Sequence, residues 1–140
     1  MEYKVVVTGY DSVLNELLHN QGKRYDARTK RYRVFNKEKE KNDRICRNCI
    51  RVSDCRNVQI SKPVYMEYNF FVPNKKHDRS NYASAFIKSF EDALQQCNVI
   101  KNDTYDLVLD YTIHFEVDTK NPRVEVVIHE VEKERKEIKQ

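Results

Sequence analysis

Apolar and polar residues alternate along four stretches of the chain, and apolar residues recur every three or four positions over residues 81–97. A period of two is typical of half-buried strands, whereas a period near 3.6 is typical of helices. Strands are therefore predicted over residues 3–8, 64–72, 107–117 and 124–128. One helix is predicted over residues 81–97. Another is expected from about Asp26 through Ile50, ending before Pro63, because proline disfavours helix in the residue before it.

These elements follow the order strand, helix, strand, helix, strand, strand, which predicts a single α/β (α+β) domain over residues 1–130. Its expected form is a mixed sheet with the helices packed on it. The polar turn of residues 118–122 predicts a hairpin of the last two strands, across which His114 and His129 could pair. Residues 131–140 are almost wholly charged and are expected to form an extension beyond the domain.

Composition narrows the class of protein only moderately. The 140 residues are enough to bury one core without disulfides or a structural metal. Lysines and arginines number 26 against 22 acidic residues, and the net charge of +4 is compatible with a polyanionic partner but common elsewhere. No apolar run approaches the roughly 18 residues of a membrane span, and no signal-peptide pattern opens the sequence. We therefore expect a cytosolic protein, without membrane contact, whose four cysteines are reduced.

The predicted helix over residues 81–97 has a polar stripe opposite its apolar face. The stripe follows steps of three or four and consists of Asn81, Ser84, Lys88, Asp92 and Gln95. Asp78 stands just before this helix and Asp103 stands in the polar loop after it. Taken alone, Asp78 is an ordinary helix cap and Asp103 an ordinary turn residue.

The ordered set of polar residues around this helix resembles the signature of RusA-type Holliday junction resolvases. In that family an Asp-x-Asp-Asn motif opens a helix with a Lys and an Asp-Ala-Leu triplet, and a second acidic motif follows the helix. The matching segments here are Asp78-Arg79-Ser80-Asn81, Lys88, Asp92-Ala93-Leu94 and Val99-Ile100-Lys101-Asn102-Asp103. Leu14-Asn15-Glu16 and Asn121-Pro122-Arg123-Val124-Glu125-Val126 are also similar to family segments. The resemblance covers most of the chain and is densest over residues 64–130.

The resemblance implies a homodimeric, Mg²⁺-dependent endonuclease that cuts four-way or branched DNA, in a bacterial cell and encoded by a phage or prophage. It implies Asp78 and Asp103 as metal ligands and Lys88 as the cation that neutralises charge on the phosphate. Converging carboxylates suit Mg²⁺, for which Mn²⁺ is a possible substitute. The two ligands flank one helix, so one must reach back or come from a partner subunit. Asn81 and two further acids, Asp92 and Asp106, are supporting candidates.

Ser80 departs from the family pattern, because it stands where the family has a second Asp. A neutral hydroxyl is a poorer ligand for a hard dication than a carboxylate. Asp92, Asp106 or Asp110 could supply the missing charge, and the residues do not choose among these three. The alternative function is a junction-binding protein whose cleavage is weak or absent.

Two basic clusters are candidates for contacts with DNA phosphates. The predicted DNA-binding residues are Lys23, Arg24, Arg28, Lys30, Arg31, Arg33, Lys75, Lys76 and Arg79. Three aromatic residues interleave with the first cluster and could stack on unpaired bases at a branch point: Tyr25, Tyr32 and Phe35. A solvated basic surface is the competing interpretation.

Cys46, Cys49 and Cys55 allow a different hypothesis, a zinc-stabilised DNA-binding module. The fourth ligand would be His19, His77 or Cys97, since a structural zinc site needs four. Reduced cysteines that pack in the core are the competing interpretation.

Overall fold

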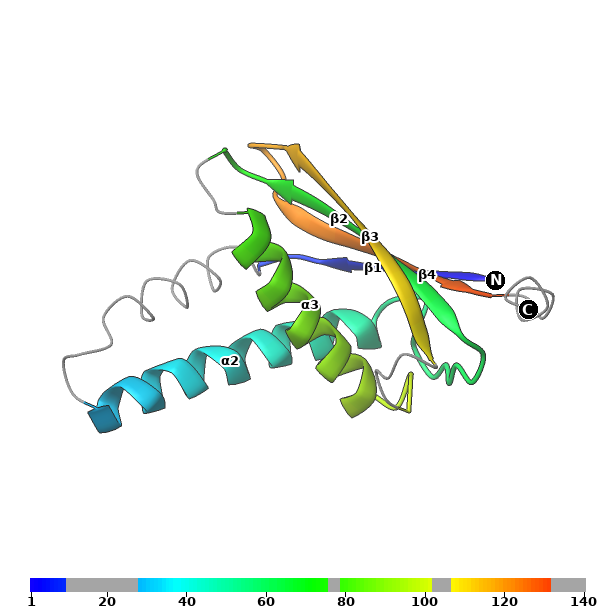
Figure 1. Cartoon of the computed structure of the whole chain (residues 1–140), viewed down its shortest axis with the longest axis horizontal. Coiled ribbons are helices and arrows are strands. Elements are labelled where there is room, and N and C mark those ends of the chain that lie inside the picture. The colour runs from blue at the N-terminus through cyan, green and yellow to red at the C-terminus, as the bar shows by residue number, and fades with distance from the viewer. Residues whose placement is uncertain (10–27, 76–78, 102–106, 132–140) are drawn as a thin grey trace.

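A four-stranded mixed sheet carries two helices on one of its faces (Figure 1). The computed structural model describes residues 1–9, 28–75, 79–101 and 107–131, with the side chains of α2 described from residue 40 onward. The elements are β1 (Glu2–Val7), α2 (Arg28–Arg51), β2 (Val64–Val72), α3 (Arg79–Gln96), β3 (Val108–Val117) and β4 (Arg123–Glu130). This order confirms the α+β class and the sequence of elements predicted above. Neither described helix is long and apolar enough to cross a membrane.

The strands lie in the order β1-β4-β2-β3. β2 and β3 are parallel, with Tyr68 opposite Ile113, and α3 is the connection between them. β4 lies between β1 and β2 and is antiparallel to both, with Val126 opposite Val5 on one side and Tyr68 on the other. β3 and β1 are therefore the two edge strands.

The predicted hairpin of the last two strands is wrong, because β2 lies between β3 and β4. The connecting turn crosses the end of β2: the Asp118 N–H donates to the Val72 carbonyl at 2.7 Å, and the Thr119 hydroxyl to the Pro73 carbonyl at 3.1 Å. Val124, Val126 and Ile128 of β4 are buried, so burial favours the central position for this strand. His114 and His129 thus lie on strands that are not neighbours.

The inner face of the sheet and α3 bury a cluster of aromatic rings. Every second residue of β2 is buried, as its alternating sequence predicts. Tyr68 and Phe70 of β2 meet Phe86 edge-on, with ring centroids 6.1 and 5.5 Å away, and Phe86 stacks on Phe90 at 5.5 Å. The buried Tyr68 hydroxyl donates to Glu91 at 2.8 Å, which satisfies the polar end of the ring. These contacts hold α3 against β2.

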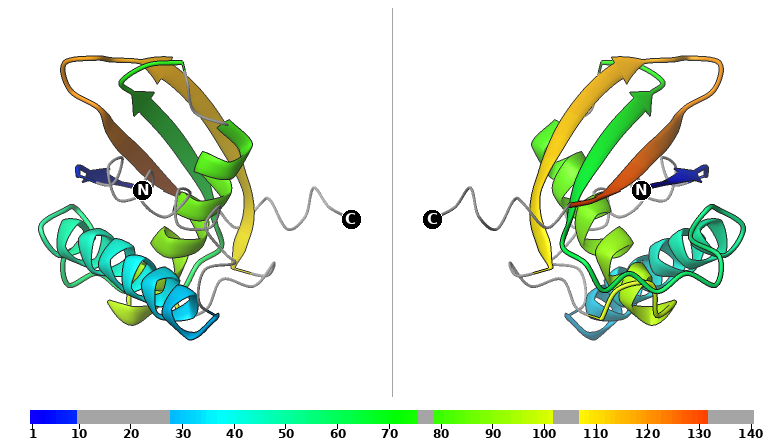
Figure 2. Two further views of the ribbon diagram at one scale, coloured as in Figure 1. Left: turned by 90° about the vertical axis from the view of Figure 1, so that its left-hand side faces the viewer. Right: turned by 90° about the vertical axis from the view of Figure 1, so that its right-hand side faces the viewer.

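Neither of the described helices lies on the outer face of the sheet, as both views in Figure 2 show. Its polar side chains pair across strands: His129 lies 3.1 Å from Glu2 on β1 and 3.0 Å from Glu67 on β2, and stacks on Tyr65 at 4.4 Å. The hydrogen bond with His129 holds the pKa of Glu67 below its usual range. Cross-strand pairs of this kind stabilise a solvated face without a covering layer.

We predict that Phe86→Ala lowers the free energy of unfolding by about 3–5 kcal/mol, because it leaves a cavity among the aromatic rings of β2 and α3. Phe86 has no exposed surface, whereas Val52 is 82% exposed and is a suitable control. Chemical denaturation monitored by circular dichroism measures both variants. Val52→Ala should change the same free energy by less than about 0.5 kcal/mol. A loss below about 1 kcal/mol in Phe86→Ala would contradict this packing.

Candidate functional site

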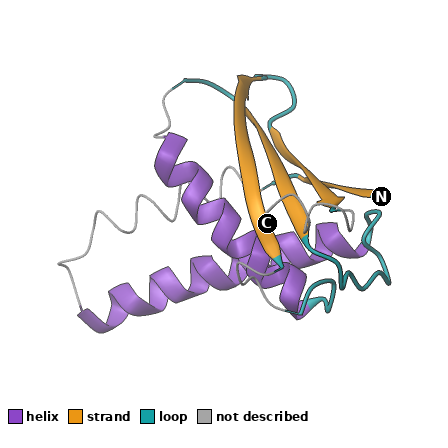
Figure 3. Ribbon diagram, turned by 45° about the vertical axis from the view of Figure 1, so that its right-hand side comes forward, coloured by secondary structure: helices purple, strands orange, loops and turns teal. Residues whose placement is uncertain are grey.

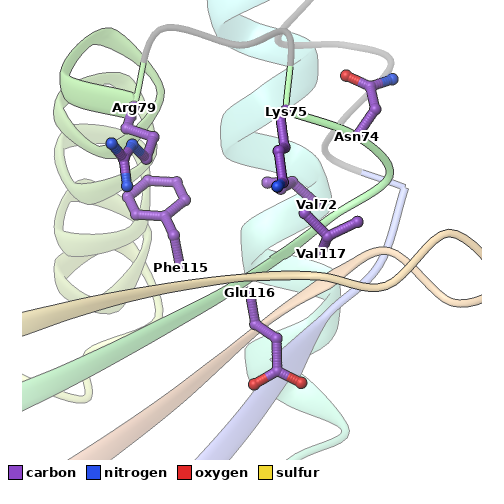
Figure 4. A pocket seen from close by; sticks show the side chains of 7 residues that line it. All are labelled: Val72, Asn74, Lys75, Arg79, Phe115, Glu116 and Val117. Atoms are coloured by element: carbon purple, nitrogen blue, oxygen red, sulfur yellow. The ribbon is translucent and has the colours of Figure 1, made fainter.

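A cavity of about 600 Å³ opens where β2 and β3 end and α3 begins (Figure 4). Its lining consists of Val72, Asn74, Lys75, Arg79, Phe115, Glu116 and Val117. Figure 4 shows the Glu116 carboxylate on the opposite side of β3, pointing away from the other six side chains. Two cations and an apolar wall therefore dominate the cavity. This combination suits a phosphate group attached to a flat or apolar moiety.

Both cations come from segments whose positions the core determines. Lys75 follows the end of β2, and Arg79 is the first residue of α3. Arg79 precedes Tyr82 and Phe86 by three and seven residues, so it lies on the helix face that packs against the sheet. That placement brings it beside Phe115, whose ring stacks on Phe70 with centroids 4.8 Å apart. Lys75 and Arg79 thus both lie at the cavity near the start of α3, and their role as DNA-phosphate contacts stays a prediction.

The polar stripe of α3 lies on the opposite side of the helix. Asn81 and Lys88 are exposed and Asp92 is half-buried. The Lys88 ammonium lies 3.3 Å from the Asp92 carboxylate, one turn away, and its side chain is 66% exposed. An exposed pair at this spacing is worth a few tenths of a kcal/mol. In the described residues Lys88 therefore forms the ordinary helix ion pair, and its proposed role at a phosphate remains a prediction.

α3 ends in a tight backbone motif that directs the following chain. Asn98 has a positive φ of 60°, its N–H donates to the Gln95 carbonyl, and the Val99 N–H donates to the Leu94 carbonyl. This is the pattern of a Schellman motif, for which Asn is a common residue in the left-handed position. Val99 and Ile100 then enter the core. Lys101 is consequently held at the end of α3 that lies farthest from Arg79.

This geometry bears on the two predicted metal ligands. The 18 residues of α3 separate its ends by about 25 Å. Asp78 and Asp103 lie outside the described residues; in the sequence Asp78 directly precedes α3 and Asp103 follows Lys101 by two residues. Two carboxylates that share one Mg²⁺ must approach within a few ångströms. The described residues do not place either carboxylate, and the 18 residues of α3 stand between them in the sequence.

Several predicted residues lie outside the described part of the chain, so the structure does not place them. They are Lys23, Arg24, Lys76, Asp78, Asp103 and Asp106, together with the aromatic Tyr25 and the possible zinc ligands His19 and His77. The side chains of Arg28, Lys30, Arg31 and Arg33, and those of Tyr32 and Phe35, are likewise not described, although all six residues belong to α2.

Among the possible replacements for the missing carboxylate, the structure describes Asp110 and Asp92. Asp110 is exposed on β3, where its carboxylate accepts a hydrogen bond from the Tyr111 N–H at 2.8 Å. Ser80 itself is exposed in the first turn of α3. None of these three lines the cavity beside Arg79.

The apolar wall of the cavity was not anticipated from the sequence. Val72, Phe115 and Val117 follow the alternation of their strands and therefore look like ordinary core residues. Parallel pairing places Phe70 opposite Phe115 and Val72 opposite Val117 at the end of the sheet. Their exposure to the cavity depends on where α3 begins, and no feature of the strands by themselves shows this.

The four cysteines are free thiols. Cys46 and Cys55 belong to the core, and burial raises the pKa of Cys46 well above its usual value and that of Cys55 to about 11. Across the described residues, no three His, Cys, Asp or Glu side chains lie together as metal ligands would. The burial of Cys46 and Cys55 in the core agrees with the packing interpretation of these two cysteines.

A scan against protein-family models finds no match for the chain. A search of curated proteins likewise finds none.

We predict that Cys46 and Cys55 of the folded protein react slowly with iodoacetamide at pH 8, since a thiol with a pKa near 11 is only about one part in a thousand thiolate at that pH. The half-buried Cys49 and Cys97 serve as internal controls and should react faster. Mass spectrometry of digested samples measures each site. Rapid alkylation of Cys55, or one equivalent of zinc retained through purification, would overturn the packing role.

Proposed function

We propose that the protein is a Mg²⁺-dependent, structure-selective endodeoxyribonuclease that cuts four-way or branched DNA during recombination or repair. The observation that carries this proposal is the cationic cavity at the start of α3, which Lys75 and Arg79 line on either side of the segment that contains Asp78. The ordered motif from Asp78 to Asp103, which resembles that of RusA-type resolvases, supplies the acidic groups such a cavity needs. The expected setting is the cytoplasm of a bacterial cell, with a phage or prophage gene.

The donor set fits a hard dication. Asp78 and Asp103 offer carboxylate oxygens, the ligands that Mg²⁺ and Mn²⁺ prefer. When bound, Mg²⁺ would lower the pKa of an attacking water and polarise the scissile phosphate. Because α3 keeps its ends about 25 Å apart, we propose that each site combines Asp78 of one protomer with the partner's Asp103 in a homodimer. Asp106 is a supporting candidate beside Asp103.

The remaining residues of the motif act on the DNA and its charge. Arg79 and Lys75 would hold a backbone phosphate at the cavity, where a planar guanidinium donates to two oxygens at once. Lys88 would neutralise charge that develops on the scissile phosphate, once it leaves its pair with Asp92. Asn81 lies on the same helix face as Lys88 and would orient a phosphate oxygen. The basic stretch of residues 23–33 would extend the phosphate contacts along a DNA arm, as would Lys76 next to the cavity.

We predict that the protein cuts a synthetic four-way junction in Mg²⁺ and that Asp103→Asn lowers the rate by about a hundredfold or more, because an amide is a poorer ligand than a carboxylate. Asp54→Asn removes an exposed carboxylate that does not line the cavity and is the matched control. Gel assays with junction and linear duplex measure rate and selectivity. Equal cutting by wild type and Asp103→Asn, or no cutting in either Mg²⁺ or Mn²⁺, refutes the nuclease.

Ser80 gives the alternative function a specific basis, since it leaves the motif one carboxylate short. In that case the protein binds junctions tightly but cuts them weakly or not at all. Ser80→Asp would then raise cleavage above wild type, whereas it should have little effect if the other acids already suffice. The same gel assay distinguishes the two outcomes.

We predict that the double variant Lys75→Ala, Arg79→Ala weakens junction binding and flattens its salt dependence. Each lost phosphate contact should reduce the slope of log affinity against log salt by about one. Arg56→Ala, an exposed cation in the turn after α2, should leave both quantities unchanged. Fluorescence anisotropy over a salt series measures them. An unchanged slope in the double variant would show that the cavity does not contact DNA phosphates.

A further inference from the structure

Exposed apolar side chains of the described residues concentrate on β3. Of the six large hydrophobic side chains that are exposed, three belong to this strand: Tyr111 at 48%, Ile113 at 40% and Val117 at 44%. They point to the helix-bearing face, because they are paired with the buried residues of β2. Figure 3 shows both helices on that side of the sheet. These three side chains therefore extend the apolar core to the β3 edge of the sheet. No described residue covers their outer side.

The two edges of the sheet differ. At the β1 edge, the Lys4 N–H donates to the Asp54 carboxylate at 3.0 Å, and the Asp54 N–H donates to the Lys4 carbonyl at 3.4 Å. The turn after α2 thus occupies this edge, and β1 is six residues long. β3 is ten residues long, contains no proline and has β2 as its single neighbour in the sheet of described residues. Long apolar edges of this kind are templates for pairing with another strand.

We propose that two copies of the chain pair through β3, antiparallel and about a twofold axis at Thr112, so that the two sheets become one. In such a pair, residues whose numbers sum to 224 lie opposite each other. Tyr111 then faces Ile113 of the partner subunit on the helix side, an aromatic and β-branched pair. On the outer side Asp110 faces His114 of the partner subunit, which gives complementary charge or a hydrogen bond.

The charges along β3 favour a twofold axis at Thr112 over one at Ile113. An axis at Ile113 would also pair apolar side chains, but it would place Asp110 opposite Glu116 of the partner subunit. Like charges directly opposite each other destabilise a strand pair. A second copy of this chain is the partner that complements β3, because each copy of the strand supplies both Asp110 and the His114 that Asp110 meets across the twofold axis.

Pairing through β3 also bears on the acidic site, an inference that rests on the proposed function. α3 runs antiparallel to β3: Arg79 shares the cavity with Val117, while Tyr111 lies beside Tyr68, whose ring meets Phe90 further along the helix. A twofold axis at the middle of β3 therefore brings the start of one α3 to the same end of the joined sheet as the end of the other. These are the two ends that carry the two halves of the acidic motif.

The interface is tested first by mass. Sedimentation equilibrium and light scattering of the wild-type chain should give twice the mass of one chain at micromolar concentration. Ile113→Lys should give a single chain with an unchanged circular dichroism spectrum, because it places two buried charges in the interface. Val52→Lys introduces the same charge at an exposed position outside β3 and should remain a dimer. A wild-type chain that is monomeric at all concentrations overturns the proposal, as does a dimeric Ile113→Lys.

Cross-linking tests the register without destabilising the fold. Two Thr112 residues on the axis have Cα atoms about 4.5–5.5 Å apart, within disulfide range. Thr112→Cys should form a covalent dimer under mild oxidation within minutes, whereas Ile113→Cys should form at least tenfold less. The wild-type chain, with its four free thiols, gives the background. Preferential cross-linking of Ile113→Cys, or equal yields above background, rejects the axis at Thr112.

A charge exchange separates this proposal from the proposed function. His114→Asp should raise the dissociation constant of the dimer at least tenfold, because it sets Asp110 against an acidic residue, and adding Asp110→His should restore dimerisation. No rescue in the double variant would contradict the pairing. A dimer with these properties that does not cut junctions refutes the nuclease but leaves the interface standing. Cleavage by a chain that stays monomeric refutes the interface and the two-protomer site, but leaves the nuclease activity standing.

Discussion

The packing of α3 against the inner face of β2 is the interaction on which the other features depend. Tyr68 and Phe70 interlock with Phe86 and Phe90, and the Tyr68 hydroxyl reaches Glu91. Close packing of aromatic rings resists sliding of the helix along the strand. The start of α3 is therefore held at the end of β2, where Lys75 and Arg79 line one cavity.

The same packing makes α3 a rigid spacer between the cavity and the segment that follows the helix. Its first residue lies at the cavity, and the Schellman motif at Asn98 together with buried Val99 and Ile100 holds the following chain at the other end. A helix of this length does not shorten without losing its hydrogen bonds. The acidic site that we propose therefore takes its two halves from two protomers, and the β3 edge, which no described residue covers, is the surface proposed for their contact.

The sequence predicted local features well because they depend on side chains close together in the chain. The alternation of β2 and the 3–4 spacing along α3 give the observed faces, and the pairing of Lys88 with Asp92 follows from their separation by one turn. The hairpin of β3 and β4 was wrong because a polar turn indicates a reversal of direction but not which strand lies alongside. β2 takes the place between them, and the turn at Asp118 crosses its end.

The sequence by itself determined the elements, their apolar faces and the acidic motif that flanks α3, since each rests on periodicity or on neighbouring residues. The tertiary structure alone decided that Phe115 and Val117 form the wall of a cavity with Arg79, and that Tyr111 and Ile113 remain exposed at an edge. The physical reason is that burial is a property of position in the sheet. An apolar strand is covered only where a helix or another strand lies over it, and the order of the strands sets that place.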